Sequence, residues 1–183
     1  AENFFKNLFS KTGLCEANLI QTKPIDTVSL KHYISQTEIE KYLKAKSNSS
    51  PGLDGLLSKN ILPRLPEWCV LINCCLLLEQ IPLSWHRSRT TLIPKSNSNA
   101  PADHRPISVS PLVYRAMSAT LARRLYQSID LHPSQRGFVE DDGIHQAITL
   151  VRYLASKKTK IASIDLAKAF DSVPHETLLK ACR

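Results

Sequence analysis

Residues 161–175, with the sequence IASIDLAKAFDSVPH, carry the residue types best suited to chemistry. The segment begins as an apolar stretch typical of a short buried strand, and Asp165 stands where that strand would end. A carboxylate at the rim of a sheet can leave the core and bind a hard cation through oxygen. Aspartates that cap turns are abundant, so the residue type alone favours a cap at Asp165. Asp171 fits a cap of the turn that leads through Pro174 into a last helix.

Positive charge is the second feature that could do chemistry. The chain has 24 Lys and Arg against 16 Asp and Glu, a formal net charge of +8. Between residues 87 and 136, eight basic residues face two acidic ones, so 8 minus 2 leaves +6. The basic residues are Arg87, Arg89, Lys95, Arg105, Arg115, Arg123, Arg124 and Arg136. Such a block suits a polyanion such as nucleic acid or a triphosphate. A solvated face without a ligand fits the charge equally well.

The elements that must position these residues begin with two helices. The pattern Thr37-x-x-Glu40 predicts a capping box that opens a helix ending near residue 47. A turn-rich loop follows, and Pro66 fits the first turn of a second helix over about residues 67–79. The high apolar content of this second helix predicts burial on most of its sides.

The middle of the chain predicts a strand and a reversal. Residues 89–93 are β-prone and end at Pro94, residues 96–102 form a polar turn, and residues 105–109 are extended. Ser110-Pro111 then caps a long helix with apolar residues at helical spacing. These residues are Leu112, Val113, Met117, Leu121 and Leu125.

The last third predicts a helix and a strand. The helix covers about residues 145–156 and turns Ile148, Val151 and Leu154 inward, and residues 160–165 form the short buried strand. Helices before and after a few strands indicate an α+β fold, with helices packed on a small, mostly antiparallel sheet.

Composition excludes several classes of protein. With 43% hydrophobic and 22% charged residues, the chain is neither disordered nor collagen-like. The longest apolar run, residues 69–78, is too short to span a bilayer, and residues 1–9 do not form a secretory signal. The five cysteines form no Cys-x-x-Cys pair, which argues against a zinc site or a disulfide framework and favours a reducing compartment.

Five motifs together resemble a known family. They are SSPGLDG at residues 49–55, RTTLIPK at 89–95, HRPISVSPLVYRAMSATLARRL at 104–125, SQRGFVEDDG at 134–143 and IDLAKAFDSVPH at 164–175. Their content and order resemble the fingers and early palm of reverse transcriptases from LINE-type, non-long-terminal-repeat retrotransposons, related to the group II intron enzymes. One such match would be weak, but five in order over residues 49–175 are specific.

The resemblance implies a role for each matching residue. It makes Asp165 a ligand of two Mg²⁺ ions, which bridge the primer 3′-hydroxyl and the phosphates of the incoming nucleotide. The backbone carbonyl of Leu166 would be a further ligand. It makes Phe170 a steric gate that excludes a 2′-hydroxyl. The implied activity is RNA-directed DNA polymerisation with deoxynucleoside triphosphates.

The resemblance also assigns residues to phosphate and nucleic-acid binding. Lys95 and Arg105 match the residues that bind the triphosphate, and Arg89 matches a basic residue on the same strand. Arg can bond phosphate oxygens in pairs, whereas Lys acts as a point charge. Residues expected to contact an RNA template or a DNA primer or target are Pro51, Gly52, Gln135, Gly137 and Phe138.

The sequence also departs from the family pattern. A complete palm carries an aromatic-x-Asp-Asp hairpin, and no Asp-Asp follows Asp165 before Arg183. We therefore expect a front part of a longer polyprotein that does not polymerise alone and needs the C-terminal part as a partner. The expected divisions are an N-terminal helical extension (1–47), fingers and early palm (48–156), and the start of the palm (157–183).

Two alternatives stay open. One is a non-catalytic nucleic-acid-binding module from a decayed or host-adopted retroelement, which would bind RNA or DNA in a salt-sensitive way. The other is a related polymerase-like protein from an intron or a splicing factor. The family resemblance implies an intracellular protein of the nucleus or cytoplasm, and no membrane partner is expected.

Overall fold

Two compact units make up the described part of the chain, one within Thr22–Ile129 and the other within Asp130–Arg183. The computed structural model describes residues 30, 32–95, 100–129, 131–132, 134–139, 142–166, 169–170 and 173–181. Each unit is described by itself. Cys15, Asp171 and Cys182 lie outside the described residues.

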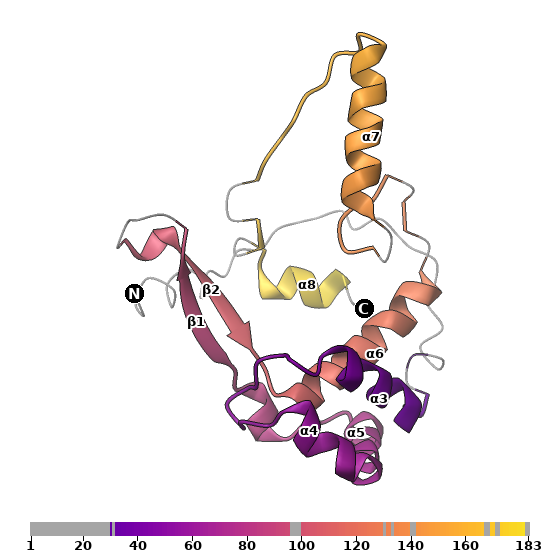
Figure 1. The fold of residues 1–183 in the computed structure, drawn as a ribbon, viewed down its shortest axis with the longest axis vertical. Coiled ribbons are helices and arrows are strands. Elements are labelled where there is room, and N and C mark those ends of the chain that lie inside the picture. Colours follow the sequence, from indigo (N-terminus) through magenta and orange to yellow (C-terminus); the bar gives the residue numbers. More distant parts are fainter. Residues whose placement is uncertain are drawn as a thin grey trace. The chain divides into compact units, whose positions relative to one another are not determined.

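The first unit contains helices and one hairpin (Figure 1). In chain order its elements are α3 (Gln36–Ala45), α4 (Ser58–Ile61), the 3₁₀ turn η1 (Leu62–Arg64), α5 (Leu65–Leu78), η2 (Leu83–His86), β1 (Arg89–Pro94), η3 (Pro101–Asp103), β2 (His104–Val109) and α6 (Leu112–Ser128).

The N-cap of helix α3 lies two residues before the predicted one at Thr37. Ser35 is the N-cap, its hydroxyl accepts from the backbone N–H of Glu38, and the Glu38 carboxylate accepts from the N–H of Ser35. The predicted box at Thr37 and Glu40 was therefore wrong. Both pairs have the same spacing, and only Glu38 is also bonded by a side chain from another helix, Arg124 of α6.

Helix α5 begins and ends close to the prediction. Its second residue is Pro66, which needs no N–H donor in the first turn, and Glu79 ends the helix in the left-handed conformation with φ 51°. The predicted burial on most sides was wrong. Only one face of α5 turns inward, and apolar residues such as Leu77 and Leu78 are exposed.

The core of this unit lies among α3, α5 and α6. Buried residues of the three helices pack together, and the ring of Trp85 from η2 lies 6.3 Å from that of Tyr114 on α6. The buried apolar residues are Ile34, Ile39, Leu43, Ile61, Leu65, Cys69, Ile72, Cys75, Trp85, Leu112, Val113, Ala116 and Met117. The predicted inward positions at the start of α6 are confirmed, whereas Leu125 near its end is exposed.

One helical stretch meets the length and composition of a membrane span. The stretch Ser58–Leu78 is 21 residues long and contains an 18-residue window with a mean hydropathy of 1.5, although a core helix passes the same test. Two features favour a core helix here. Cys69 and Ile72 are buried against the other helices, and Arg64 and Glu67 form an ion pair within the stretch.

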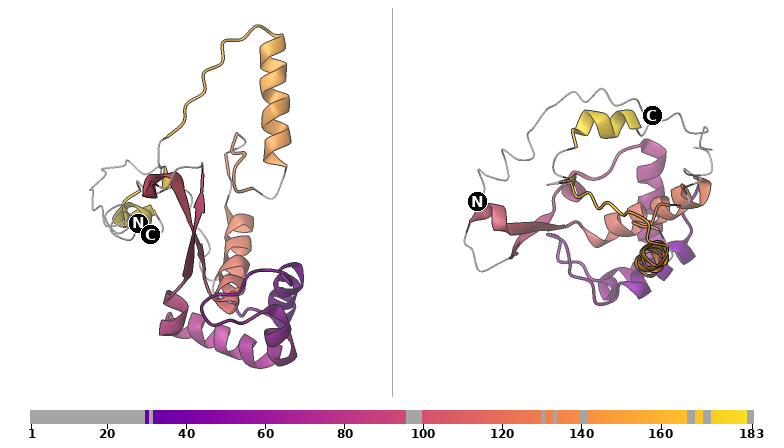
Figure 2. Two further views of the ribbon diagram at one scale, coloured as in Figure 1. Left: turned by 60° about the vertical axis from the view of Figure 1, so that its left-hand side comes forward. Right: turned by 90° about the horizontal axis from the view of Figure 1, so that it is seen from above.

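Strands β1 and β2 form an antiparallel hairpin that extends away from the helices of its own unit (Figure 2). The register pairs Arg89 with Val109 and Pro94 with His104, and Pro106 faces Leu92. Every residue of β1 is exposed. The predicted strand, reversal and extended segment are confirmed, and so is the α+β class with a small antiparallel sheet.

The second unit contains α7 (Gly143–Ser156) and α8 (His175–Ala181). Residues 161–166 are extended but form no strand, and all six are exposed, so the predicted buried strand was wrong. A strand needs a hydrogen-bonded neighbour, and the sheet of the described chain contains only β1 and β2. On α7 the side chains of Ile148 and Val151 are about half exposed, which contradicts their predicted inward orientation.

Candidate active site

The β1–β2 hairpin presents two arginines on one face. Arg105 faces Ile93 in the ladder, and Ile93 lies four residues from Arg89, so side-chain alternation places both arginines on the same side. Their Cα atoms are separated by roughly 13 Å along the strands, at about 3.3 Å per residue. Both are exposed, and neither pairs with a carboxylate of the described chain. This face can bind an extended anion.

Lys95 lies at the tip side of the same hairpin. Its backbone N–H donates to the carbonyl of Asp103 at 2.7 Å, which continues the ladder beyond β1. Its ammonium donates to the carbonyl of Ala102 at 3.3 Å and is exposed. The single, exposed bond leaves two further N–H donors for an anion.

Two arginines of the basic block, Arg115 and Arg124, form hydrogen bonds or ion pairs within the protein itself. The Arg115 guanidinium donates to the Ser49 hydroxyl and to the Ser50 carbonyl, both at 2.7 Å, and so holds the loop that precedes Gly52. Arg124 is engaged with Glu38. The interpretation of the whole block as polyanion-binding was therefore too broad.

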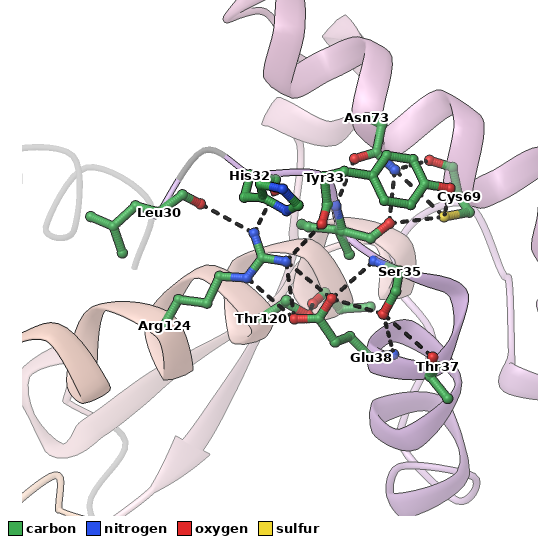
Figure 3. Close-up of polar contacts among 12 residues, drawn as sticks. Leu30, His32, Tyr33, Ser35, Thr37, Glu38, Cys69, Asn73, Thr120 and Arg124 are labelled. Atoms are coloured by element: carbon green, nitrogen blue, oxygen red, sulfur yellow. Dashed lines mark hydrogen bonds and ion pairs between the residues drawn. The ribbon is translucent and has the colours of Figure 1, made fainter. Parts of the chain in front are cut away.

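Arg124 joins α6 to the start of α3 (Figure 3). Its guanidinium bonds both carboxylate oxygens of Glu38, at 3.1 and 3.0 Å, and donates to the carbonyls of Leu30, His32 and Tyr33. Partial burial raises the pKa of the Glu38 carboxyl, but the bonds from Ser35 and the charge of Arg124 outweigh that effect. The net result is a pKa below the ordinary value.

The loop at residues 49–55 buries one of its two predicted nucleic-acid residues. Gly52 is buried, and a Cβ atom there would lie 2.7 Å from the backbone nitrogen of Pro111. Pro51 is half-buried, and Gly55 has a φ of 67° that suits glycine. The side chains of Leu53 and Asp54 reach solvent from this loop, and sequence reasoning singled out neither of them.

Asp165 and Leu166 are adjacent and exposed in the extended segment 161–166. A carboxylate and a backbone carbonyl are hard oxygen donors of the kind that Mg²⁺ prefers, so these residues fit part of a magnesium site. Within the described residues, no group of three or more His, Cys, Asp or Glu side chains could hold a metal ion. Asp165 and the Leu166 carbonyl thus offer two oxygen donors at this position.

Phe170 and Phe138 contact each other in the second unit. Their ring centroids lie 6.1 Å apart and the rings are nearly perpendicular, at 88°. The loop that carries Phe138 is closed by the Gln135 side chain, whose amide donates to the Gly137 carbonyl at 2.8 Å. A Cβ atom on Gly137 would meet nothing within 4 Å.

The structure thus groups most of the predicted site residues in two sets, and it places Pro51 and Gly52 on a separate loop of the first unit. Arg89, Lys95 and Arg105 share the hairpin of the first unit. The residues from 135 to 170 belong to the second unit, where the Phe138–Phe170 contact joins two motifs that sequence reasoning treated separately. Side-chain contacts between segments 32 residues apart leave no local signal in the sequence.

Comparison with known proteins shows similarity to reverse transcriptases. Residues 93–183 match the model of the reverse transcriptase (RNA-dependent DNA polymerase) family. The chain is 35% identical over 156 residues to a retrovirus-related Pol polyprotein from the type-1 retrotransposable element R2 of Popillia japonica, covering 81% of this chain and 22% of that protein.

Two further relatives are similar over most of the chain. The Pol polyprotein of the type-2 retrotransposable element R2DM of Drosophila melanogaster is 37% identical over 145 residues, 74% of this chain and 14% of that protein. The type-1 R2 polyprotein of Nasonia vitripennis is 34% identical over 159 residues, 82% of this chain and 15% of that protein. The chain thus spans about a fifth or less of the length of these relatives.

Proposed function

Because the chain belongs to the reverse transcriptase family, in the form carried by LINE-type retrotransposons, we propose that the full-length protein is an RNA-directed DNA polymerase. It adds deoxynucleotides to the 3′-hydroxyl of a DNA primer or target on an RNA template. The observation that carries this proposal is the family match over residues 93–183, which includes Asp165, exposed at the end of an extended segment.

The hairpin face is the proposed binding surface for the triphosphate. Arg105 and Arg89 bring two planar guanidinium groups to one face, and each can bond a pair of phosphate oxygens. Lys95 adds a point charge from the same hairpin. Together they neutralise negative charge on the nucleotide and orient its phosphates for attack.

Asp165 and the Leu166 carbonyl are the proposed magnesium ligands. When bound, two Mg²⁺ ions stabilise the attacking and leaving oxygens of an in-line displacement. The chain's own contribution is to supply hard oxygen donors and to fix their position. Since no group of three or more His, Cys, Asp or Glu side chains of the described residues could hold a metal ion, we propose that further carboxylates come from a C-terminal part of the polyprotein and that this chain alone does not polymerise.

The remaining site residues are proposed to select and guide the substrates. Phe170 excludes a 2′-hydroxyl from the sugar position, and Gln135, Gly137 and Phe138 lie on the loop that meets it. Pro51 and Gly52 belong to the loop proposed to lie near the template. In this scheme residues 48–156 are the fingers and early palm, residues 157–183 begin the palm, and the protein acts inside the cell.

Primer extension by the full-length protein tests the proposal. We expect Asp165→Asn to reduce DNA synthesis on an RNA template to background, because an amide cannot neutralise a divalent cation as a carboxylate does. Glu67→Gln, an exposed position on α5, should extend primers at the wild-type rate. Wild-type synthesis by the Asp165→Asn protein would refute the assignment.

A non-catalytic nucleic-acid-binding module is the second candidate. It is favoured by the described residues, among which no group of three or more His, Cys, Asp or Glu side chains could hold a metal ion. This candidate predicts RNA or DNA binding whose affinity falls steeply with salt, without any primer extension by the full-length protein.

A further inference from the structure

Phe138 and Phe170 form an aromatic pair that is exposed to an unusual degree. Their side chains are 88% and 80% exposed, so burial of apolar surface does not explain why they lie together. The rings meet edge to face, with centroids 6.1 Å apart, in a geometry that aromatic pairs favour electrostatically. The pair orients each ring without covering it.

The loop around Phe138 has an unusual backbone conformation that is held by hydrogen bonds. Phe138 has a φ of 59°, a left-handed conformation that is rare for a bulky side chain. The Gln135 side chain donates to the carbonyl of Gly137, immediately before Phe138, and the Gln135 backbone N–H donates to the carbonyl of His132. Strained conformations of this kind are retained mostly where the strain serves a function.

Helix α7 anchors the other side of the loop. Gly143, its first residue, lies so close to the Arg136 backbone that an added Cβ atom would come within 2 Å of the Arg136 carbonyl oxygen. The loop is therefore packed against α7 at Arg136, two residues before Phe138, and closed by Gln135, three residues before it. These contacts hold the backbone of the loop before Phe138 and at the start of α7 after it.

We infer that Phe138 is a positioning residue for Phe170 and helps to set the preference for deoxynucleotides over ribonucleotides. This inference rests on the proposed function, in which Phe170 excludes the 2′-hydroxyl. A gate excludes a hydroxyl only while its ring stays in place, and an exposed ring has few neighbours to keep it there. Phe138 supplies that neighbour in the described chain.

The test is a double-mutant cycle in the full-length polymerase. We compare kcat/KM for a deoxynucleotide and the matching ribonucleotide on one primer and template, in wild type, Phe138→Leu, Phe170→Val and the double variant. Phe138→Leu should lower the deoxy-to-ribo ratio by about 2- to 10-fold, the range set by the energy of an edge-to-face pair. The change should lie in KM for the ribonucleotide.

The cycle separates positioning from a direct role of Phe138 at the template. Because the ratio compares two nucleotides on the same template, a template effect of Phe138→Leu cancels. If Phe138 acts through Phe170, Phe138→Leu should not change the deoxy-to-ribo ratio any further in the Phe170→Val background. Phe138→Tyr keeps the ring and should retain the wild-type ratio, and Ile144→Ala, an exposed change on α7, should do the same.

A second measurement needs no activity. With 4-fluorophenylalanine at position 170 of the 183-residue chain, Phe138→Leu should shift the ¹⁹F resonance, because it removes the ring current of the neighbour. An unchanged ratio together with an unshifted resonance would overturn the inference while leaving DNA synthesis, and so the proposed function, intact. Absence of any synthesis by the wild-type polymerase would instead refute the proposed function.

Discussion

Replacing Arg124 with methionine should destabilise the first unit more than any neighbouring surface substitution. The Arg124 and Glu38 side chains are 15% and 29% exposed, between a surface pair and a fully buried one. Exposed pairs contribute up to about 1 kcal/mol, and breaking a buried pair costs about 3 to 5 kcal/mol. We therefore expect Arg124→Met to lower the free energy of unfolding by about 2 to 3 kcal/mol, because it also leaves the Leu30, His32 and Tyr33 carbonyls without this donor.

Urea denaturation of the 183-residue chain measures this loss. For an m-value of about 1.5 kcal/mol/M, the midpoint should fall by about 1 to 2 M. Arg123→Met is the matched control, because Arg123 is the adjacent, half-buried arginine of α6 and forms no ion pair with the described chain. It should change stability by less than about 0.5 kcal/mol. Equal losses from both variants would refute the assigned role of Arg124.

The pH dependence gives an independent check on the same pair. The folded-state pKa of Glu38 lies below its ordinary value of 4.5, so its carboxylate contributes stability above that pH. This contribution is lost as the pH falls below 4.5 and through the folded-state pKa. The difference between wild type and Arg124→Met should therefore shrink in that acidic range. A difference that stays constant down to pH 2 would contradict the reasoning.

Two further predictions concern Gly52 and Arg105. Gly52→Ala should destabilise the chain by about 1 to 3 kcal/mol in urea denaturation, because the added Cβ would lie 2.7 to 2.9 Å from the Ser110–Pro111 backbone. Gly137→Ala is the control, since a Cβ atom there meets nothing within 4 Å, and it should leave the free energy of unfolding nearly unchanged. Equal effects of the two alanines would count against the close approach at Gly52. Arg105→Lys in the full-length polymerase should raise the KM for deoxynucleotides by about tenfold, because one charge-assisted bond of the guanidinium pair is lost. Arg64→Lys on the distant η1 turn is the control, and a KM unchanged by Arg105→Lys would place the triphosphate elsewhere.

Local sequence patterns predicted the hairpin and the helices well. Pro66 located the first turn of α5, and the β-prone residues 89–93 with the following polar turn located β1 and the reversal. The prediction failed where two patterns overlap, as at the start of α3, since Ser35 and Thr37 each have a glutamate three residues later. The contact with Arg124, 86 residues away, distinguishes them, and spacing within one helix cannot show it.

Burial and side-chain partners were the least predictable properties. The apolar residues of 160–165 predicted a buried strand, but burial depends on a neighbouring strand that the described chain does not provide. Similarly, charge counting could not separate Arg115, which bonds Ser49 and Ser50, from Arg105, which stays exposed. The site residues themselves were found from motif resemblance, and their roles stay predictions.

The two prolines of the hairpin bear on how readily its strand edges could pair with other chains. A two-stranded ribbon has two outer edges, and no further strand of the described chain covers either of them. Such edges are templates for strand addition by other copies. Pro94 and Pro106, one in each strand, each remove an N–H donor, and Arg89 and Arg105 add charge. The arginines proposed to bind the nucleotide would thus also disfavour strand pairing between the exposed hairpins of two copies of this chain.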